Sequence, residues 1–413
     1  MATERVPASL SGATSHGQLL DRIRTTGGMS RQQLLSSTGM SRATLYERLE
    51  TLLRRNLIYE AESMEATGGR RSRKIRFDDR GRVVLAFALG QTHATVSVSD
   101  TDGLLLRFLT VEHRINAPDD VVLRPLIRVG TELLDSGSGE TLIGIGVSLP
   151  APVEAETGAV VHSTTIPNWR PDAVTSAMTD MWHVPVVVEN DARAGALGEG
   201  SDIGETTVYV KVATGIGCGI VIDGSILRGA HGAAGDIGHI RVASDGPVCR
   251  CGRRGCLATF SSGGSLLDRL SSAGINTLDD IVEAAAAGHP RVEELLLSGA
   301  DVLGGALAAT VATINPNRLV IGGKIGTIPL FAKQVGDRVQ RDVVDRISDG
   351  LTVTVGAPGD AAAVTGLTQL VVRKVYSAET IDSQLTEFAQ NLQPELARHS
   401  QTIRGVAARH AAV

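Results

Sequence analysis

The most informative stretch of the chain reads Gly235-Asp-Ile-Gly-His239 and, ten residues later, Cys249-Arg-Cys-Gly-Arg-Arg-Gly-Cys256. One imidazole and three thiols, those of His239, Cys249, Cys251 and Cys256, are gathered there among several glycines. An imidazole and three thiolates form a closed tetrahedral set that suits Zn²⁺ and leaves no position open for catalysis. Free thiols in a loop are the alternative, and a disulfide is disfavoured because three cysteines cannot all pair and Cys218 lies in another segment. The stretch therefore predicts a structural zinc site.

The same stretch resembles the signature of a known family. Gly-Asp-Ile-Gly-His followed by Cys-x-Cys-Gly-x-x-Gly-Cys-Leu looks like the motif of the ROK family, which comprises repressors, open reading frames and sugar kinases. In that family the histidine and the three cysteines bind zinc, and the zinc loop shapes a sugar pocket in the cleft of an actin-like fold. The resemblance covers roughly residues 14–376 and implies an α/β actin-like (ribonuclease H-like) body of two lobes.

Length and composition set the class of protein. A chain of 413 residues is long enough for two or three domains. With 42% hydrophobic residues it can bury sizeable cores, while 47 glycines and only 3% aromatic residues favour an α/β protein over an all-β one. No uninterrupted apolar run reaches the roughly 18 residues of a membrane span, and the N-terminus lacks the apolar region of a signal peptide. We therefore expect a cytoplasmic protein, associated with the nucleoid if it binds DNA.

Charge is unevenly distributed along the chain. Residues 1–80 hold 14 Lys plus Arg against 9 Asp plus Glu, a net charge of +5. Since the whole chain has a net charge of −5, the remaining 333 residues have a net charge of −10. A basic module on an acidic body indicates that only residues 1–80 meet a polyanion such as nucleic acid. Charge alone leaves a second interpretation open, in which the arginines only solvate helix surfaces.

The pattern of the N-terminal module, residues 1–80, favours nucleic acid. Leu19, Leu20 and Ile23 lie at helical spacing, and Ser30-Arg-Gln-Gln33 has the form of a capping box that begins a second helix. Gly39 ends that helix, and Ser41 is a suitable N-cap for a third one, whose inner face holds Leu45, Leu49, Leu52 and Leu53. Helix, glycine turn and helix form the plan of a helix-turn-helix domain. Two short strands, Leu57–Tyr59 and Lys74–Phe77, then enclose a basic wing, Thr67–Arg73.

This winged helix-turn-helix places specific side chains at DNA. The N-terminal part of the second helix of the motif enters the major groove, so we expect contacts from Ser41, Arg42, Ala43, Thr44, Tyr46 and Arg48. The wing should add Arg70, Arg71 and Arg73, which can reach a narrow minor groove. A surface hairpin with idle arginines is the alternative, but the Gly-Gly-Arg-Arg of the wing resembles that of ROK repressors.

From Val83 the chain alternates strand-like and helix-like segments. The pattern predicts three strands over Val83–Leu89, Ala94–Val98 and Leu104–Val111, a helix over 119–134 and a buried strand over Thr141–Leu149. This order fits an actin-like lobe, and the resemblance implies a second lobe from about Val208 and a helix over 361–376 that returns to the first. We therefore expect a body over residues 81–376, with the lobe boundary near 190–208, and a polar tail over 377–413 without an assigned role.

Three loops would hold ATP in a kinase of the family, and the first has lost its chemistry. The kinase pattern Asp-x-Gly-Gly-Thr is here Ala88-Leu-Gly-Gln-Thr92, so a carboxylate near the metal-nucleotide is gone and Gln91 fills phosphate space. The second and third loops, Ala213–Gly219 and Asn315–Gly323, keep their glycines, but glycine turns between strands are common for steric reasons. We therefore expect no catalytic residues.

The resemblance also implies a sugar pocket, partly kept and partly changed. Asn168, Asn190, Asp191, Asp236 and His239 match its positions, with Asp191 at the place of the family's general base. Asn190 and Asp191 have a second interpretation, as caps of a helix that begins near Ala192. Ala258 replaces a glutamate and Ala151 a glycine against the sugar, so we expect a less polar and tighter pocket than a glucose site.

Three hypotheses about function follow. The first, which we favour, is a DNA-binding transcriptional regulator, in its expected form a repressor, that acts on a double-stranded operator as a homodimer or a dimer of dimers and senses a sugar-like ligand without phosphorylating it. The second is a sugar kinase with a regulatory DNA-binding module; Ala88, Gln91 and Ala258 argue against it and Asp191 for it. The third is an interaction module, in which the body and the zinc loop only assemble oligomers.

Overall fold

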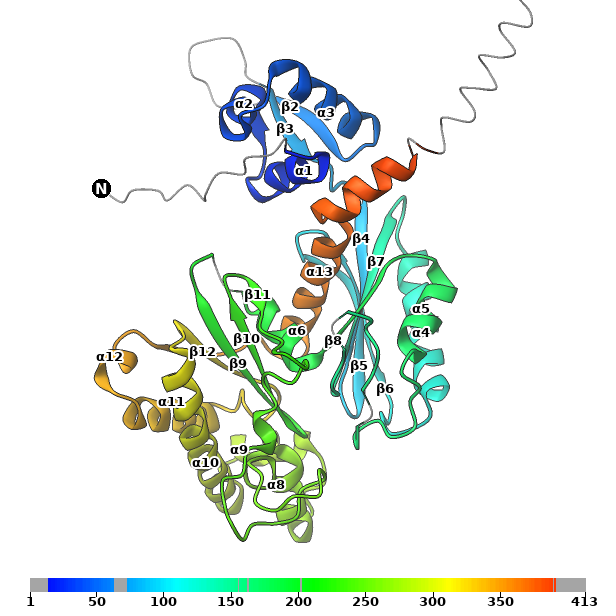
Figure 1. The fold of residues 1–413 in the computed structure, drawn as a ribbon. Coiled ribbons are helices and arrows are strands. Elements are labelled where there is room, and N and C mark those ends of the chain that lie inside the picture. Colours follow the sequence, from blue (N-terminus) through cyan, green and yellow to red (C-terminus); the bar gives the residue numbers. More distant parts are fainter. Residues whose placement is uncertain are drawn as a thin grey trace, which may run out of the picture. The chain divides into compact units, whose positions relative to one another are not determined.

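A computed structural model of the chain describes residues 14–62, 73–154, 156–161, 163–200, 203–388 and 390 (Figure 1). The chain forms two compact units. The first, here called the head, comprises Met1–Arg80 and Val372–Val413, and the second, here called the body, comprises Gly81–Val371. The head thus takes in both ends of the chain, whereas the sequence pattern predicts residues 1–80 as a module of their own and 377–413 as a separate tail.

The N-terminal part of the head contains three helices and a small sheet. The helices are α1 (His16–Thr25), α2 (Arg31–Thr38) and α3 (Arg42–Arg54), and the strands β1 (Met29–Ser30), β2 (Ile58–Glu62) and β3 (Arg73–Phe77) pair in the order β1-β3-β2. Ser30 and Gln33 form the predicted capping box, and Gly39 ends α2 in the left-handed region with a φ of 67°. The Ser41 hydroxyl accepts a hydrogen bond from the Thr44 N–H and so caps α3. These predicted limits are confirmed.

The apolar faces of these helices form the core of the head. Its leucines, Leu19, Leu20, Leu34, Leu45, Leu49 and Leu52, are each at most 1% exposed. Most of the wing, residues 63–72, lies outside the described residues, and with it the predicted contacts Arg70 and Arg71. At the other end of the chain, residues 378–388 form a further helix, which Ser377 caps by accepting the Thr380 N–H at 3.1 Å.

The first lobe of the body is a five-stranded sheet covered by two helices. Its strands are β4 (Arg82–Leu89), β5 (His93–Asp100), β6 (Leu105–Glu112), β7 (Thr141–Leu149) and β8 (Val186–Asn190), in the order β6-β5-β4-β7-β8. The helices α4 (Asp119–Asp135) and α5 (Ala173–Trp182) pack on it, with Phe87 and Trp182 6.0 Å apart between ring centroids. The predicted strand and helix order is confirmed, with ends that differ by a few residues.

The second lobe repeats the plan of a mixed sheet with helices. Its strands are β9 (Thr206–Val212), β10 (Ile216–Ile222), β11 (Ser225–Ile226), β12 (Arg318–Gly322) and β13 (Thr352–Val355), in the order β11-β10-β9-β12-β13. Its helices are α6 (Asp191–Gly198), α7 (Ala258–Ser261), α8 (Gly263–Leu270), α9 (Leu278–Ala286), α10 (Pro290–Ile314), α11 (Pro329–Asp342) and α12 (Asp345–Ser348), with short 3₁₀ turns at Ile237–His239 and Ser271–Ala273. Among the described residues, the candidate functional site lies between the sheets of these two lobes.

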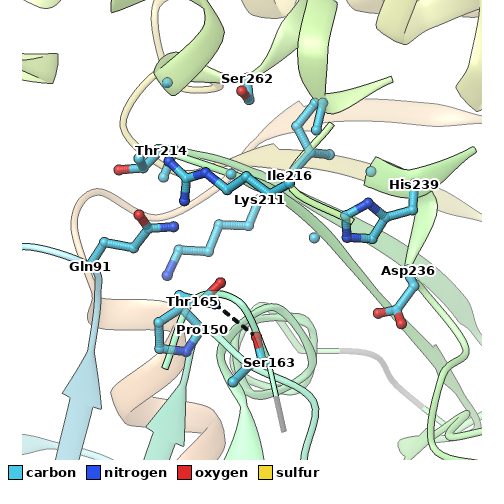
Figure 2. A pocket seen from close by; sticks show the side chains of 18 of the residues that line it. Gln91, Pro150, Ser163, Thr165, Lys211, Thr214, Ile216, Asp236, His239 and Ser262 are labelled. Atoms are coloured by element: carbon cyan, nitrogen blue, oxygen red, sulfur yellow. Dashed lines mark hydrogen bonds between the residues drawn. The ribbon is translucent and has the colours of Figure 1, made fainter. Parts of the chain in front are cut away.

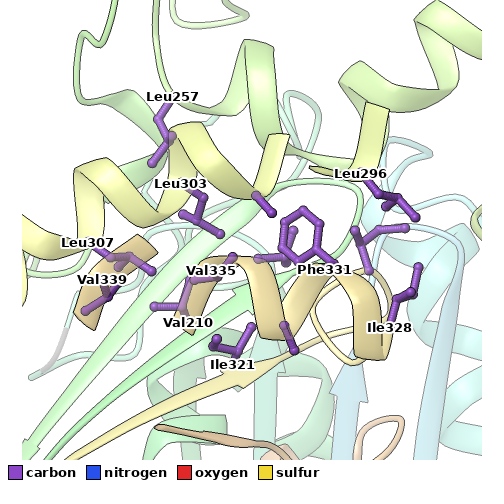
Figure 3. Close-up of a cluster of buried hydrophobic side chains, with 14 of the residues drawn as sticks. Val210, Leu257, Leu296, Leu303, Leu307, Ile321, Ile328, Phe331, Val335 and Val339 are labelled. Atoms are coloured by element: carbon purple, nitrogen blue, oxygen red, sulfur yellow. The ribbon is translucent and has the colours of Figure 1, made fainter. Parts of the chain in front are cut away.

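The long helix α10 anchors the core of the second lobe. Figure 3 shows Leu303 and Leu307 of α10 facing Phe331, Val335 and Val339 of α11 over the strands of the sheet. By length and composition alone α10 is apolar enough to cross a membrane, although Asp301 interrupts its apolar sequence. Half of its most apolar window is buried against its neighbours. Its apolar character is therefore accounted for by the core of the lobe.

Helix α13 (Ala361–Val375) closes the body against both lobes. Its residues Ala363, Val364 and Leu367 are buried in one cluster with Ala86 and Ala88 of β4 and Ala194 of α6. The approach is close because Gly146 of β7 faces the helix: a Cβ on Gly146 would lie 2.8 Å from the Leu367 Cβ. The predicted last helix is confirmed, and Ala88 belongs to its packing surface.

Candidate functional site

A cavity of about 440 Å³ lies between the two lobes of the body (Figure 2). The first lobe contributes residues that directly follow strands β4 and β7, among them Gln91 and Pro150. The second lobe contributes the end of β9, the glycine-rich turn into β10, the loop that carries His239 and the start of α8. In open α/β sheets ligands bind outside the carboxyl ends of the strands, and this cavity has that position.

An ion pair that the sequence analysis did not predict lies in this cavity. Lys211 Nζ is 2.9 Å from Asp191 Oδ2, and both side chains are only 14% exposed. Burial would lower the pKa of Lys211, but the carboxylates of Asp191 and Asp360 outweigh it and raise that pKa above its ordinary value. Lys211 therefore stays charged, and Asp191, the match to the family's general base, accepts a hydrogen bond from a permanent cation. One oxygen of the Asp191 carboxylate is therefore already engaged by Lys211 within the cavity.

Asp360 extends the polar network away from the cavity. It is the residue before α13, and it accepts a hydrogen bond from Thr95 Oγ1 at 2.8 Å and lies 3.4 Å from His93 Nε2. Burial would raise the pKa of Asp360, yet His93 and Lys211 lower it on balance. The network therefore joins β5, β9 and the start of α13 by polar and charged groups that are all at least partly buried.

Asn190 and Asp191 have the second of the two predicted roles, that of helix caps. Asn190 Oδ1 accepts the N–H groups of Ala192 at 3.0 Å and Arg193 at 3.2 Å, and Asp191 Oδ1 accepts the same Ala192 N–H at 2.8 Å. Both residues nevertheless line the cavity, so capping and ligand contact are compatible. The preceding Glu189 is buried and paired with Arg193 at 2.7 Å, which fixes the start of α6.

Two of the remaining predicted pocket residues lie where the sequence analysis expects them, and one does not. Asp236 and His239 line the cavity at its edge (Figure 2), and burial raises the pKa of the Asp236 carboxyl. Asn168 is not among the lining residues: it is exposed, and its Nδ2 lies 3.4 Å from the Asn116 carbonyl. The neighbouring Trp169 is buried and donates a hydrogen bond to the Ile115 carbonyl, which fixes this segment against the first lobe.

Some residues that line the cavity were not predicted from the sequence. Ser163 and Thr165 line the cavity in the region where Asn168 was expected, and no motif marks them. Ala151 and Ala258 line it as predicted. Lys211 is the only charged residue in the strand Thr-Thr-Val-Tyr-Val-Lys-Val over 206–212, and a single lysine in a buried strand is a signal that could have identified it.

The first glycine-rich loop differs from a phosphate cradle in two ways. Ala88 is 2% exposed and packs under α13, so this position belongs to the core. Gln91 reaches the opposite lobe: a Cβ placed on Gly215 would lie 3.9 Å from the Gln91 amide nitrogen. The Gln91 side chain thus occupies the space between the two glycine-rich loops, where a nucleotide's phosphates would have to enter.

The four predicted metal ligands converge. Their ligand atoms all lie within 4.8 Å of one another in His239, Cys249, Cys251 and Cys256. The Cys251 and Cys256 sulfurs are 3.7 Å apart, and His239 Nδ1 is 3.5 Å from the Cys249 sulfur. With Zn–S near 2.3 Å and Zn–N near 2.0 Å, a tetrahedral ion separates two sulfurs by about 3.8 Å and a sulfur and a nitrogen by about 3.5 Å. The sulfur separation is far longer than a disulfide, and the set fits a tetrahedral metal ion.

Glycine at 255 is required by the turn that brings these ligands together. Gly255 has a φ of 73°, and a Cβ there would lie 1.9 Å from the Ala243 carbonyl oxygen. The chain turns at this point, with the Cys249 N–H bonded to the Arg253 carbonyl at 2.7 Å.

The fourth cysteine, Cys218, lies apart from this cluster in the apolar core around β10, where burial raises the pKa of its thiol to about 12.

In the head, the predicted recognition helix presents a polar surface. Arg42 and Ala43 are exposed, and Tyr46 is 48% exposed with the Arg31 guanidinium 5.0 Å from its ring centroid. Arg31 is held by Glu60, which also pairs with Arg73 at 3.2 Å. Arg31 was not predicted as part of this surface, because it belongs to the helix before the recognition helix.

Arg48 differs from the other predicted DNA contacts. Its Nη1 atom is buried with no hydrogen-bond partner in the described part of the chain. Burial and the Arg48 charge together lower the pKa of His16 on α1, which places Arg48 beside that imidazole. Arg48 is therefore half-buried, with one nitrogen of its guanidinium enclosed by the head. Ser41 and Thr44 are hydrogen-bonded to each other at 2.8 Å at the start of α3.

Comparisons with known proteins extend over both units. The model of the ROK family matches residues 84–374. The chain is 26% identical over 365 residues to the xylose repressor of Bacillus spizizenii, covering 86% of this chain and 94% of the repressor. It is 31% identical over 265 residues to the glucokinase of Halalkalibacterium halodurans, covering 59% of this chain and 80% of the enzyme. A solved ROK family transcriptional regulator, a homolog of the E. coli MLC protein, matches with a TM-score of 0.74 at 25% identity, covering 89% of this chain and 97% of that one.

Proposed function

The chain belongs to the ROK family, and from this premise we propose that it is a DNA-binding transcriptional repressor whose body senses a small polyhydroxylated ligand without phosphorylating it. The observation that carries the proposal is the head, in which a capped helix α3 presents Arg42, Ala43 and Tyr46 to solvent. The similarity to the xylose repressor supports it, because an alignment over 86% of the chain extends beyond the body into the head.

DNA recognition follows from the geometry of α3. A recognition helix reads the major groove with its N-terminal residues, and one such helix covers too few base pairs for specificity. We therefore propose that the chain binds as a homodimer or a dimer of dimers to a roughly palindromic site, with half-site centres about 10 base pairs or a multiple apart. Arg42, Ala43 and Tyr46 contact bases, and the wing arginines Arg70, Arg71 and Arg73 contact the backbone or the minor groove.

Selection of binding sites from random duplex DNA by the full chain tests this proposal. Arg42→Ala should relax the selected sequence and weaken binding to the preferred site by roughly 5- to 150-fold, the value of one good base contact. Arg71→Ala should weaken binding to all sequences and reduce its salt dependence. Arg124→Ala, on α4 of the body with 82% of its side chain exposed, is the matched control and should change neither. Selection that recovers no common sequence, or an Arg42→Ala variant that selects the wild-type site equally well, would contradict the proposal.

Loss of kinase activity is the second part of the proposal. Phosphoryl transfer depends on positioning and on neutralising charge around the metal-nucleotide, which a carboxylate at position 88 would assist. Here Ala88 is core, Gln91 lies between the glycine-rich loops and Asp191 is paired with Lys211. Each of these features opposes catalysis, so we propose that the body is not an enzyme.

A sugar kinase is the second candidate, and two observations favour it. The glucokinase relative is 31% identical over its matched region, and Asp191 is present in the cavity. Measurement of ADP release with glucose, other hexoses and N-acetyl hexosamines separates the two candidates. We expect no turnover, whereas steady turnover that is abolished by Asp191→Asn would support the kinase.

The ligand of the cavity is proposed from its lining. Asn190, Asp191 and Asp236 offer polar atoms to hydroxyl groups, while Ala151 and Ala258 make the cavity smaller and less polar than a glucose site. A ligand with fewer hydroxyls than glucose, or another sugar in a shifted pose, should therefore bind better. Titration calorimetry with a panel of pentoses and hexoses tests this: tight glucose binding, or binding of any sugar unchanged by Asn190→Ala with Asp191→Ala, would contradict it. Asn168→Ala, outside the cavity, is the control.

We further propose that the metal is Zn²⁺ and that its role is structural. Three thiolates and an imidazole satisfy four-coordinate zinc completely, so no position is open for a substrate. The bound ion would fix the loop of residues 239–256, which supplies His239, Pro247 and Cys249 to the cavity lining.

A further inference from the structure

The end of the described chain packs against the helix at its beginning. We infer that residues 376–388, here called the C-terminal clamp, are a working part of the DNA-binding head: they hold α1, and α1 in turn holds the recognition helix α3. The inference rests on the proposed DNA binding and adds to it a set of positioning residues more than 300 positions away from α3 in the sequence.

The first contact completes the N-terminus of α1. The first N–H groups of a helix have no partner within the helix and favour negative charge. Ser15 accepts the Gln18 N–H at 3.1 Å, but α1 has no acidic residue in its first turn. Asp382 Oδ1 supplies the missing acceptor, because it receives the Gly17 N–H at 2.9 Å. The half-buried Asp382 carboxylate of the clamp therefore acts as a cap for a helix near the opposite end of the chain.

The second contact is a close approach of two backbones. A Cβ on Gly17 would lie 2.2 Å from the Ala378 carbonyl oxygen, a distance that no side chain tolerates. The first turn of the clamp helix thus lies directly against α1, and glycine at position 17 is what permits it. Gly17 is buried although it carries no side chain of its own.

Two aromatic contacts extend the clamp to other elements of the head. Tyr376 is 3% exposed and meets Phe77 of β3 edge-to-face, with ring centroids 4.7 Å apart and an interplanar angle of 79°. At the other end of the clamp, the Arg55 guanidinium lies 3.4 Å from the centroid of the Phe388 ring. Arg55 directly follows α3, so the clamp contacts the end of the recognition helix itself. Ile381, in the same segment, is also buried, with 2% of its surface exposed.

These contacts matter for DNA because α1 packs on both α3 and β3. His16 at the start of α1 lies within electrostatic range of Arg48 on α3 and of Asp382 on the clamp. A recognition helix binds well only when its position is fixed before binding, since ordering it afterwards reduces the affinity. Without the clamp, α1 loses a cap and one packing surface, and α3 loses the support that fixes its position.

Three variants test the clamp: a chain truncated after Tyr376 and the full-length substitutions Gly17→Leu and Asp382→Asn. We expect the truncated chain and Gly17→Leu to bind the preferred DNA at least 10-fold more weakly, and Asp382→Asn several-fold more weakly. Glu387→Gln, an exposed carboxylate on the same helix, is the matched control and should bind as the wild type. Both tryptophans, Trp169 and Trp182, lie in the body, so an unchanged denaturation midpoint by tryptophan fluorescence will show that the body is intact in each variant.

A second measurement does not depend on DNA binding. Amide hydrogen exchange of Leu19, Leu20 and Ile23 in α1 should be at least 10-fold faster in the truncated chain than in the wild type. Faster exchange with weaker DNA binding supports the clamp. Unchanged exchange in α1, or wild-type DNA affinity of the truncated chain, overturns it. If the wild type itself binds no DNA, the proposed function fails, and the exchange rates alone decide whether the clamp holds α1.

Discussion

The ion pair between Lys211 and Asp191 offers the sharpest test of the cavity. Lys211→Met keeps the length of the side chain and removes its charge. Coulomb's law gives about 6 kcal/mol for unit charges 2.9 Å apart at an effective dielectric constant of about 20, and desolvation of the ammonium cancels much of it. Removing one partner of a buried pair costs about 3–5 kcal/mol because the other charge is left without a partner. We expect Lys211→Met to lower the free energy of unfolding of the body by that amount.

Urea denaturation followed by tryptophan fluorescence measures this change, because Trp169 and Trp182 both report on the body. Asp191→Asn combined with Lys211→Met should be less destabilised than the sum of the single variants, with a coupling energy of about 1–3 kcal/mol. Lys333→Met is the control: its ion pair with Asp337 is on the surface, with the lysine 74% exposed, and should contribute within about 0.5 kcal/mol. If Lys211→Met is no more destabilised than Lys333→Met, the pair does not contribute as the geometry requires.

The effect also has a defined pH dependence. The folded protein raises the pKa of Lys211 above its ordinary value of 10.5, so the stability contributed by the charge is fully present below that value and is lost only as the pH rises through the higher pKa of the folded state. The destabilisation by Lys211→Met should therefore be the same from about pH 6 to about pH 9. A loss that disappears within this range would contradict the assignment of the charge to Lys211.

Three further outcomes are expected. Purified protein should contain about one zinc per chain, and Cys251→Ser should lose it while Cys218→Ser keeps it; elemental analysis that finds no metal in the wild type removes the zinc proposal. The Cys218 thiol, whose pKa burial raises to about 12, should not react with a thiol reagent in the native protein at neutral pH even after zinc has been chelated; four rapidly reacting thiols would contradict its burial. ATP should raise the denaturation temperature less in the wild type than in Gln91→Gly, because the Gln91 side chain lies in the proposed phosphate space. Equal and strong stabilisation of both proteins would show that it does not obstruct ATP.

Much of the fold is predictable because short stretches of sequence determine where its helices, turns and strands begin and end. The capping box at Ser30, the turn at Gly39 and the apolar run of the buried strand Thr141–Leu149 depend on residues a few positions apart, and the structure confirms them. The cluster of His239 and the three cysteines is predictable for the same reason, since three of its four residues lie within eight positions.

The contacts that were not predicted join residues far apart in the chain. Asp191 and Lys211 lie on different elements, and nothing near either residue indicates the other. Asp382 caps α1 across 365 positions, so the tail has no recognisable role until the fold is known. Asn168 was misplaced because the resemblance gives a position in the sequence but not the direction in which a side chain points, which buried Trp169 determines here.

The packing of Ala88 has a consequence for any substitution that would place a carboxylate at this position. Its methyl group is packed with Ala363, Val364 and Leu367, so a carboxylate restored there would be placed among apolar atoms under α13. Burying an unpaired charge costs several kcal/mol or forces the group to take up a proton, and a neutral acid no longer assists a metal ion. A reversion at this single position would therefore loosen the body before it restored any catalysis.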